Sequence, residues 1–118
     1  MTKPGRLLVT RESPKRSYHL AGRGRIEGGE LVVYLDDIGR FTMDPIRVRV
    51  VLLLGGTVPI TGPDGVDIIG ERREGGRGLW IPVGEEWYSI PVRSLIPVLE
   101  GKAKKAPVFR WEKETDNG

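Results

Sequence analysis

The stretch "ELVVYLDDIGRFTM", residues 30–43, has the pattern of a β-hairpin. In its first half Leu31, Val33 and Leu35 fall on one face, as in a strand with one buried side. "DDIG" then supplies turn-forming residues, and "RFTM" forms the returning strand. A two-stranded hairpin is marginal alone and needs further strands or a helix on its apolar face. This segment therefore predicts one hairpin of a larger domain.

Further short runs of β-forming residues, each bounded by glycine, proline or a polar loop, extend this pattern in both directions. They predict strands at 6–12, 18–20, 46–54, 57–61, 66–71, 79–83 and 87–92. In the run 46–54, five aliphatic side chains would share one face, and Arg47 and Arg49 would begin the other. We expect eight or so short strands, closed into a barrel or a two-sheet roll.

Glycine and proline limit the number of helices. Pro91 and Pro97 lie in "IPVRSLIPVLEG", residues 90–101, and each removes a donor from a strand ladder, so we interpret this stretch as a bent edge strand. "AGRGRIEGG", residues 21–29, is interpreted as a glycine-punctuated turn and bend. The best helical windows are 94–105, which Pro97 and Gly101 interrupt, and 108–115. We expect at most one short C-terminal helix.

The composition indicates one domain. A chain of 118 residues has the length of a single unit, and we expect one β-domain over 1–118 with flexible basic termini at about 1–4 and 112–118. No apolar run reaches the length of a membrane span or a signal peptide, so we expect a cytoplasmic protein. Cysteine is absent, which excludes disulfides, thiolate metal sites and a cysteine nucleophile. Glutamine is absent and Asn117 is the only asparagine, which fits either a thermophilic source or biased base composition.

The basic residues separate by type along the chain. Every lysine lies near a terminus, whereas every basic residue between 16 and 101, apart from the one histidine, is an arginine. Arginine stems cover apolar surface and arginine heads pair bidentately with anions. The groups "GRGR" at 22–25 and "GGRG" at 75–78 would let a polyanion approach the backbone, although structural turns with exposed arginines are the simpler interpretation.

The candidate binding residues combine these arginines with aromatic stacking partners. They are Arg23, Arg25, Arg47, Arg49, Arg77, Arg93, Trp80, Trp87 and Tyr88. Basic and aromatic side chains together on a sheet are typical of oligonucleotide-binding β-barrels. Between residues 31 and 99, however, nine acidic residues outnumber seven arginines, which weakens the field that would attract nucleic acid.

Residues suited to catalysis are few. His19 is the only histidine, which excludes a multi-histidine metal site, and none of the four serines lies in a hydrolase motif. The acidic pairs fall at predicted turns. Asp64, Asp67 and Glu71 have the outline of a divalent-metal nuclease motif but lack the lysine expected after the glutamate. We expect no catalytic residue, no metal ligand and no cofactor, with a small metal-dependent enzyme as a minor alternative.

Two parts of the chain echo one another. "RIEGG" at 25–29 returns as "RREGG" at 72–76, and "PIR" at 45–47 returns as "PVR" at 91–93. Phe41 and Trp87 would then occupy matching places. Two similar β-units packed about a pseudo-twofold axis would explain the echo. Chance in a chain rich in glycine and arginine would explain it equally well.

One stretch carries a resemblance to a known family. "EEWYSIPVRSLIPVL", residues 85–99, resembles the strand–strand junction of PH- and GRAM-like domains, in which a hairpin is followed by Ile-Pro and a hydrophobic residue. The resemblance covers these fifteen residues and implies binding of a lipid headgroup or a peptide. The chain departs from the family in lacking a C-terminal amphipathic helix to close the barrel.

From these patterns we predict a non-enzymatic interaction module. It would recognise a protein or an anionic partner through an arginine-bearing β-face and an edge strand, since edge strands tolerate proline and can pair with another chain. A protein partner or self-association is the leading expectation. A nucleic-acid-binding barrel is the alternative, and an anionic lipid headgroup is the partner that the PH-like resemblance implies.

Overall fold

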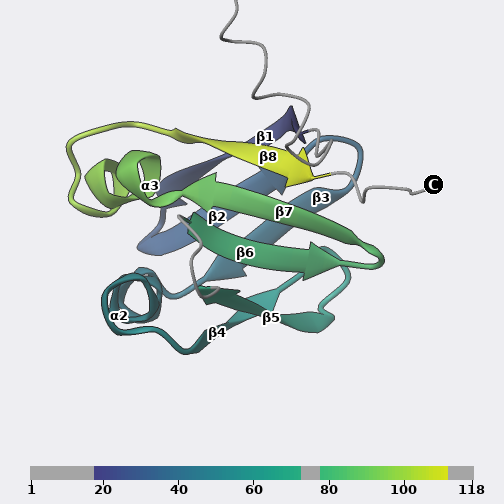
Figure 1. Cartoon of the computed structure of the whole chain (residues 1–118), viewed down its shortest axis with the longest axis horizontal. Coiled ribbons are helices and arrows are strands. Elements are labelled where there is room, and N and C mark those ends of the chain that lie inside the picture. The colour runs from purple at the N-terminus through teal and green to yellow at the C-terminus, as the bar shows by residue number, and fades with distance from the viewer. Residues whose placement is uncertain (1–17, 73–77, 112–118) are drawn as a thin grey trace, which may run out of the picture.

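The computed structural model describes residues 18–72 and 78–111. Within them, eight strands follow one another in chain order around a closed antiparallel barrel (Figure 1). The strands are β1 (Tyr18–Glu27), β2 (Glu30–Leu35), β3 (Gly39–Met43), β4 (Thr57–Thr61), β5 (Asp67–Arg72), β6 (Gly78–Val83), β7 (Glu86–Pro91) and β8 (Ala106–Trp111). The predicted all-β barrel of about eight strands is confirmed. The strand predicted at 6–12 and both termini predicted to be flexible lie outside the described residues.

The barrel interior contains the alternate side chains of each strand. The predicted hairpin at 30–43 is confirmed: Leu31, Val33 and Leu35 enter the core from β2, and Phe41 and Met43 enter it from β3. The other strands add their own inward residues, which are Val58, Ile60, Leu79, Ile81, Tyr88, Ile90, Ala106 and Val108. Period-two alternation thus produces one continuous core.

Closure of the barrel depends on β1, which pairs with β2 on one side and β8 on the other. The interpretation of residues 21–29 as a turn was wrong, because most of them extend this strand. Gly22 lies so close to β2 that a Cβ atom there would stand 2.0 Å from the carbonyl oxygen of Tyr34. Gly22 therefore allows the two backbones to approach within the sheet, and the glycines of β1 do not break the strand.

Closure also removes the predicted edge strand. Each described strand pairs with two neighbours, so no strand offers a complete unpaired side to another chain. The prolines lie where few ladder bonds are needed. Pro82 lies in β6, which pairs with β5 only through Trp80 and Leu79, and Pro59 lies in β4, which pairs with β3 only through Thr61. A proline in each of these strands is thus accommodated without an edge.

Residues 46–54, predicted as a strand, instead lie in helix α2 (Pro45–Leu54). The helix begins at Asp44, whose side chain accepts a hydrogen bond of 2.9 Å from the backbone N–H of Ile46. Pro45 takes the first helical position, where its missing N–H is not needed. At the other end Arg72 donates a 2.7 Å hydrogen bond from Nη1 to the carbonyl oxygen of Leu52. These contacts satisfy groups that a helix leaves unpaired at its ends.

Residues 92–99 form a second helix, α3 (Val92–Leu99), so the interpretation of 90–101 as a bent edge strand was wrong. Pro97 lies inside this helix, where it removes the hydrogen bond of its own N–H and crowds the preceding turn, but the helix ends only two residues later. Gly101 has a φ of 77° and ends the helix: its N–H donates to the carbonyl of Val98, and the N–H of Lys102 donates to the carbonyl of Pro97. This paired arrangement is a Schellman cap. The expectation of at most one helix, at the C-terminus, is therefore corrected to two helices, α2 and α3, within the described residues.

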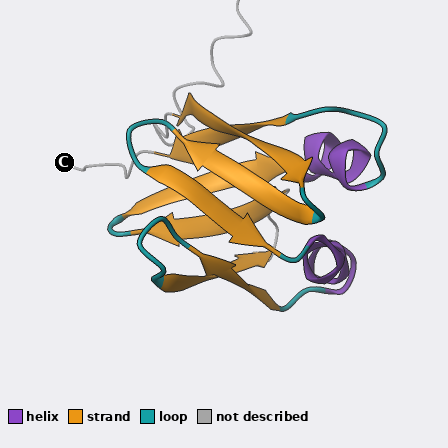
Figure 2. Cartoon of the chain, turned by 180° about the vertical axis from the view of Figure 1, so that it is seen from behind, coloured by secondary structure: helices purple, strands orange, loops and turns teal. Residues whose placement is uncertain are grey.

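The two halves of the barrel share one element order, which is three strands, a helix and a strand. Core positions recur 47 residues apart, as in Val48 with Leu95 and Val51 with Val98. Phe41 does not match Trp87, because Phe41 points into the core and its counterpart there is Tyr88. Both helices lie at one end of the barrel, where they contribute to the same core (Figure 2).

The close approach of β1 to β2 can be tested with two glycines of one strand. Gly22→Ala forces a Cβ against the Tyr34 carbonyl, whereas a Cβ at Gly24 meets its nearest neighbour, a methyl group of Val33, at an ordinary 3.5 Å. We expect Gly22→Ala to lower the free energy of unfolding by about 1–3 kcal/mol or more. Gly24→Ala should change it by less than about 1 kcal/mol. Urea unfolding of both variants measures the difference, and equal stabilities would contradict this account of closure.

Candidate functional site

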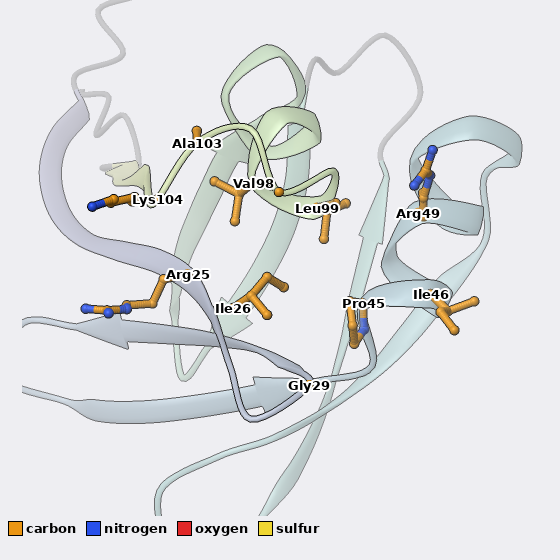
Figure 3. Close-up of a pocket in the computed structure, with 11 residues that line it drawn as sticks. Arg25, Ile26, Gly29, Pro45, Ile46, Arg49, Val98, Leu99, Ala103 and Lys104 are labelled. Carbon is orange, nitrogen blue, oxygen red and sulfur yellow. The ribbon is translucent and has the colours of Figure 1, made fainter.

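A groove opens at the helix-bearing end of the barrel, between the β1–β2 turn, α2 and the segment that leaves α3. Its volume is about 620 Å³, and it is lined by Arg25, Ile26, Gly29, Pro45, Ile46, Arg49, Val98, Leu99, Gly101, Ala103 and Lys104. Figure 3 shows Arg25 and Lys104 at one side and Arg49 at the other, with Ile26, Val98 and Leu99 between them. This helix groove therefore has an apolar floor between cationic rims.

Among the described residues, no acidic side chain lines the helix groove, but two carboxylates pair with its cations from outside. Arg25 Nε lies 3.1 Å from Glu27 Oε2, and Arg49 Nη2 lies 3.6 Å from Glu100 Oε2. These pairs are half exposed and contribute little to stability. Lys104 is exposed and makes no ion pair within 18–72 and 78–111. The groove can therefore offer the uncompensated positive charge of Lys104. Arg25 and Arg49 can add two more when a ligand replaces their weak pairs with Glu27 and Glu100.

A second feature continues from the groove along the outer face of α2. Ile46, Val50, Leu53 and Leu54 are 73%, 42%, 65% and 82% exposed. Their spacing places them on one side of the helix, opposite the buried Val48, Val51 and Leu52. We call these four residues the α2 ridge. Ile46 belongs to both the ridge and the helix groove, so the two features form one surface.

The two arginines of α2 flank the α2 ridge. Arg47 and Arg49 are two positions apart in the helix, which separates them by about 200° around its axis. Arg47 donates a hydrogen bond of 3.1 Å from Nε to the carbonyl oxygen of Thr57, and Arg49 faces the groove. The helix itself, "PIRVRVVLLL", contains no acidic residue. Its exposed side is thus apolar along the middle and positive along both edges.

The other predicted arginines are distributed over several surfaces. Arg47 and Arg49 were expected on a strand face but lie on α2. Arg23 lies on β1, where its guanidinium stands 5.1 Å from the centre of the Tyr34 ring. Arg93 is exposed on α3 and does not line the groove. Arg77 lies outside the described residues. Of the predicted arginines that the structure describes, Arg25 and Arg49 therefore share the helix groove and the others do not.

The predicted aromatic residues are brought together only in part. Trp80 and Trp87 lie on the outer face of the barrel with ring centres 6.1 Å apart, and Trp111 lies 5.5 Å from Trp80. Tyr18 stacks on Trp111 at 4.8 Å. Because these rings pack against one another, part of each face is already covered. The cluster lies on β6, β7, β8 and β1, and none of its rings lines the helix groove.

Tyr88 is only 4% exposed and points into the core, so it does not share a face with Trp80 and Trp87. Burial is the main cause that raises the pKa of its hydroxyl group above the ordinary value of 10.0. The Glu86 carboxylate adds to the increase through its charge and a hydrogen bond, while Arg110 opposes it. This tyrosine is a core residue that keeps its proton.

The predicted acidic triad does not form a cluster. Among the residues that the structure describes, no three histidine or acidic side chains lie close enough to hold a metal ion. Asp67 accepts a hydrogen bond of 3.2 Å from Thr61 across the β4–β5 pair, which is a structural role. Asp64 precedes Gly65 in the turn between the same strands. The outline of a metal motif in the sequence therefore does not correspond to a gathered site.

The residues that the sequence patterns missed are Lys104, the apolar floor of the groove and the α2 ridge. These features all involve α2, α3 or the segment that follows α3, and neither helix was predicted. Asp44-Pro45 and Gly55 are the start and stop signals of a helix, and they would have placed Ile46, Val50, Leu53 and Leu54 on one side. The approach of the segment after α3 to the β1–β2 turn has no such local signal.

Comparison with protein-family models, with curated proteins and with solved structures finds no significant match to this chain. Neither the helix groove nor the aromatic cluster therefore inherits a role from a relative. In the described part of the chain, neither helix has the length and apolarity needed to cross a bilayer.

The raised pKa of Tyr88 predicts a loss of stability in alkali. The unfolded chain releases this proton near pH 10 and the folded chain only above it, so stability falls as the pH rises beyond 10. In Tyr88→Phe this contribution is absent, at a cost of about 1 kcal/mol at neutral pH. Thermal melts on both sides of pH 10 should show a steeper decline for the unmodified chain. Parallel declines would contradict the assignment to Tyr88.

Proposed function

We propose that this chain is a non-enzymatic binding module that recognises an anionic, partly apolar partner at the helix-bearing end of its barrel. The observation that carries the proposal is the composition of the helix groove: three cationic side chains, no acidic one, and an apolar floor. A polar anion alone would gain nothing from Ile26, Val98 and Leu99. An uncharged apolar ligand would leave Arg25, Arg49 and Lys104 unused.

The chemistry of the groove favours a ligand with a charged head and an aliphatic body. Its guanidinium and ammonium groups can donate charge-assisted hydrogen bonds to a phosphate or carboxylate. The apolar floor would stabilise the aliphatic body by about 25 cal/mol for each Å² removed from water. Concave sites with an apolar lining and a few convergent polar groups are the usual form of small-ligand sites.

The rigidity of the surroundings supports recognition without large rearrangement. Arg49 and Lys102 both contact Glu100, at 3.6 Å and 3.3 Å, so one carboxylate connects α2 with the end of α3. Glu27 holds Arg25 while its carboxylate also accepts a hydrogen bond from the Tyr34 hydroxyl at 2.9 Å. Arg25 and Arg49, though not Lys104, are thereby partly oriented before a ligand arrives, which reduces the entropy lost on binding.

The groove can be tested with a pair of soluble amphiphiles that differ only in the head group. Octyl phosphate, kept below its micelle concentration, should shift the NMR signals of groove residues, and octyl glucoside should bind at least about tenfold more weakly. Arg49→Gln with Lys104→Gln should reduce octyl phosphate affinity by about tenfold or more.

Arg40→Gln with Arg93→Gln is the matched control, since it removes two exposed arginines that do not line the groove. We expect this control to keep the affinity within about twofold, because exposed charges at a distance are screened. Equal losses in both double variants would mean that net charge, and not the groove, determines binding.

Nucleic-acid binding is the second candidate, and the aromatic cluster around Trp80, Trp87 and Trp111 is the observation that favours it. Bases would stack on such rings with support from nearby cations. The rings already pack on one another, however, and Arg110 is held at 3.2 Å by Glu86. The cluster is therefore less suited to nucleic acid than its composition implies.

We expect neither single- nor double-stranded oligonucleotides to bind measurably at low salt. Tryptophan fluorescence reports the titration directly, because Trp80, Trp87 and Trp111 are the three tryptophans of the chain. Binding that falls steeply as salt is raised would restore the nucleic-acid hypothesis and displace the groove as the main functional surface.

A further inference from the structure

Packing among the described residues does not explain the α2 ridge. Of the seven aliphatic residues in α2, three are buried and four form the ridge, with Leu54 82% exposed. In α3, the helix at the corresponding place in the second unit, Leu95 and Val98 are buried and Val92, Ile96 and Leu99 are partly buried against the same core. One helix therefore uses its aliphatic residues inside the barrel, and the other keeps a row of them outside.

The position of the ridge limits what can cover it. Figure 1 shows α2 at a corner of the molecule, on the outside of the barrel end. The ridge is exposed and purely aliphatic. Arg47 follows one edge and Arg49 the other, and no acidic residue occurs within the helix. A surface that matches it must be apolar along the middle and negatively charged on both sides.

We propose that the α2 ridge is a membrane-contact element, which inserts its aliphatic residues into the outer part of an anionic bilayer while Arg47 and Arg49 pair with lipid phosphates. An exposed aliphatic stripe flanked by arginines is the pattern of helices that lie in the plane of a membrane surface. The proposal does not use the PH-like resemblance, which covers residues 85–99, because it depends on α2. It rests on the proposed function, because it names the anionic, partly apolar partner.

Other occupants fit the same surface less well. In a second copy of this chain, ridge against ridge would bring four arginines together with no acidic residue of α2 to pair with them. Nucleic acid would offer phosphates but nothing for four aliphatic side chains. A bilayer supplies both features over an area that needs no shaped pocket, and the adjoining helix groove could receive one lipid head.

The first arm of the experiment measures binding to vesicles by co-sedimentation. Vesicles of equal parts phosphatidylglycerol and phosphatidylcholine should bind the protein, and vesicles of phosphatidylcholine alone should bind it far more weakly. Leu53→Ser with Leu54→Ser should lower the partition coefficient at least about tenfold. Arg47→Gln should lower it about fivefold and make it less dependent on salt. Ile69→Ser, which removes a 51% exposed isoleucine from β5, is the matched control and should have no effect.

The second arm asks whether the ridge itself enters the bilayer. The chain has no cysteine, so a polarity-sensitive dye can be attached at a single introduced position. Dye on Leu53→Cys should shift to shorter wavelength with phosphatidylglycerol vesicles. Dye on Val66→Cys, at a 61% exposed position in the β4–β5 turn, should not shift. Because both native side chains are exposed, neither substitution should disturb folding.

The outcomes separate this inference from the proposed function. If octyl phosphate binds the groove but the dye at position 53 does not respond to either vesicle, the membrane proposal is overturned and the binding module stands. If neither probe binds, both fail. A protein that is dimeric in solution, with Leu53→Ser and Leu54→Ser restoring the monomer, would assign the ridge to self-association and overturn the membrane proposal.

Discussion

The closure of β1 against β8 is the constraint on which the rest of the structure depends. It requires β1 to run close beside β2 at Gly22, where a side chain would collide with the Tyr34 carbonyl, and to change register with β8 between Leu20 and Gly22. Once the barrel is closed, the inward side chains share one core, and each described strand pairs with a neighbour on both sides, although β3 with β4 and β5 with β6 meet only briefly. Recognition by addition of a strand, which is common in open sheets, therefore finds no complete strand side in the described barrel. The surfaces that the described strands offer to a partner are mainly side chains on the outer face or at an end.

The duplicated element order explains why one end of the barrel carries the candidate site. Each unit places its helix between its third and fourth strands, so both helices reach the same end and contribute to the same core. Arg72, just before the second unit's hairpin, reaches the carbonyl of Leu52 at the end of α2. Arg25 holds the matching place in the first unit, and it lines the groove beside the end of α3. The two units share the same order of elements, but the equivalent arginines differ in role. Arg72 caps α2, whereas Arg25 lines the open groove beside α3.

The strands were predictable where alternation and turn residues agreed. Residues 30–43 combine both signals, and their hairpin and inward face were predicted correctly. The run 46–54 could not be assigned by periodicity, because a stretch in which almost every residue is aliphatic fits a period of 2 and a period of 3.6 equally well. The decisive signals were its ends, Asp44-Pro45 and Gly55. In α3, Pro97 was interpreted as a strand breaker, yet it lies near the end of a short helix that continues to Leu99. The helix groove was beyond sequence reasoning because it joins residues from positions 25 to 104, which only closure of the barrel brings together.

Helix α2 contains aliphatic residues that the fold requires and aliphatic residues that it does not require. Val48, Val51 and Leu52 suffice to hold α2 on the core, and polar residues at the four ridge positions would satisfy the same helix with equal or better solubility. Their aliphatic character is therefore not a consequence of folding. Single exposed aliphatic residues are common on soluble proteins, but four in one row, flanked by two arginines and continuous with a cationic groove, are not explained in that way. Because burial among the described residues does not account for the row, we attribute it to the contact proposed above, and its charged borders favour an anionic surface.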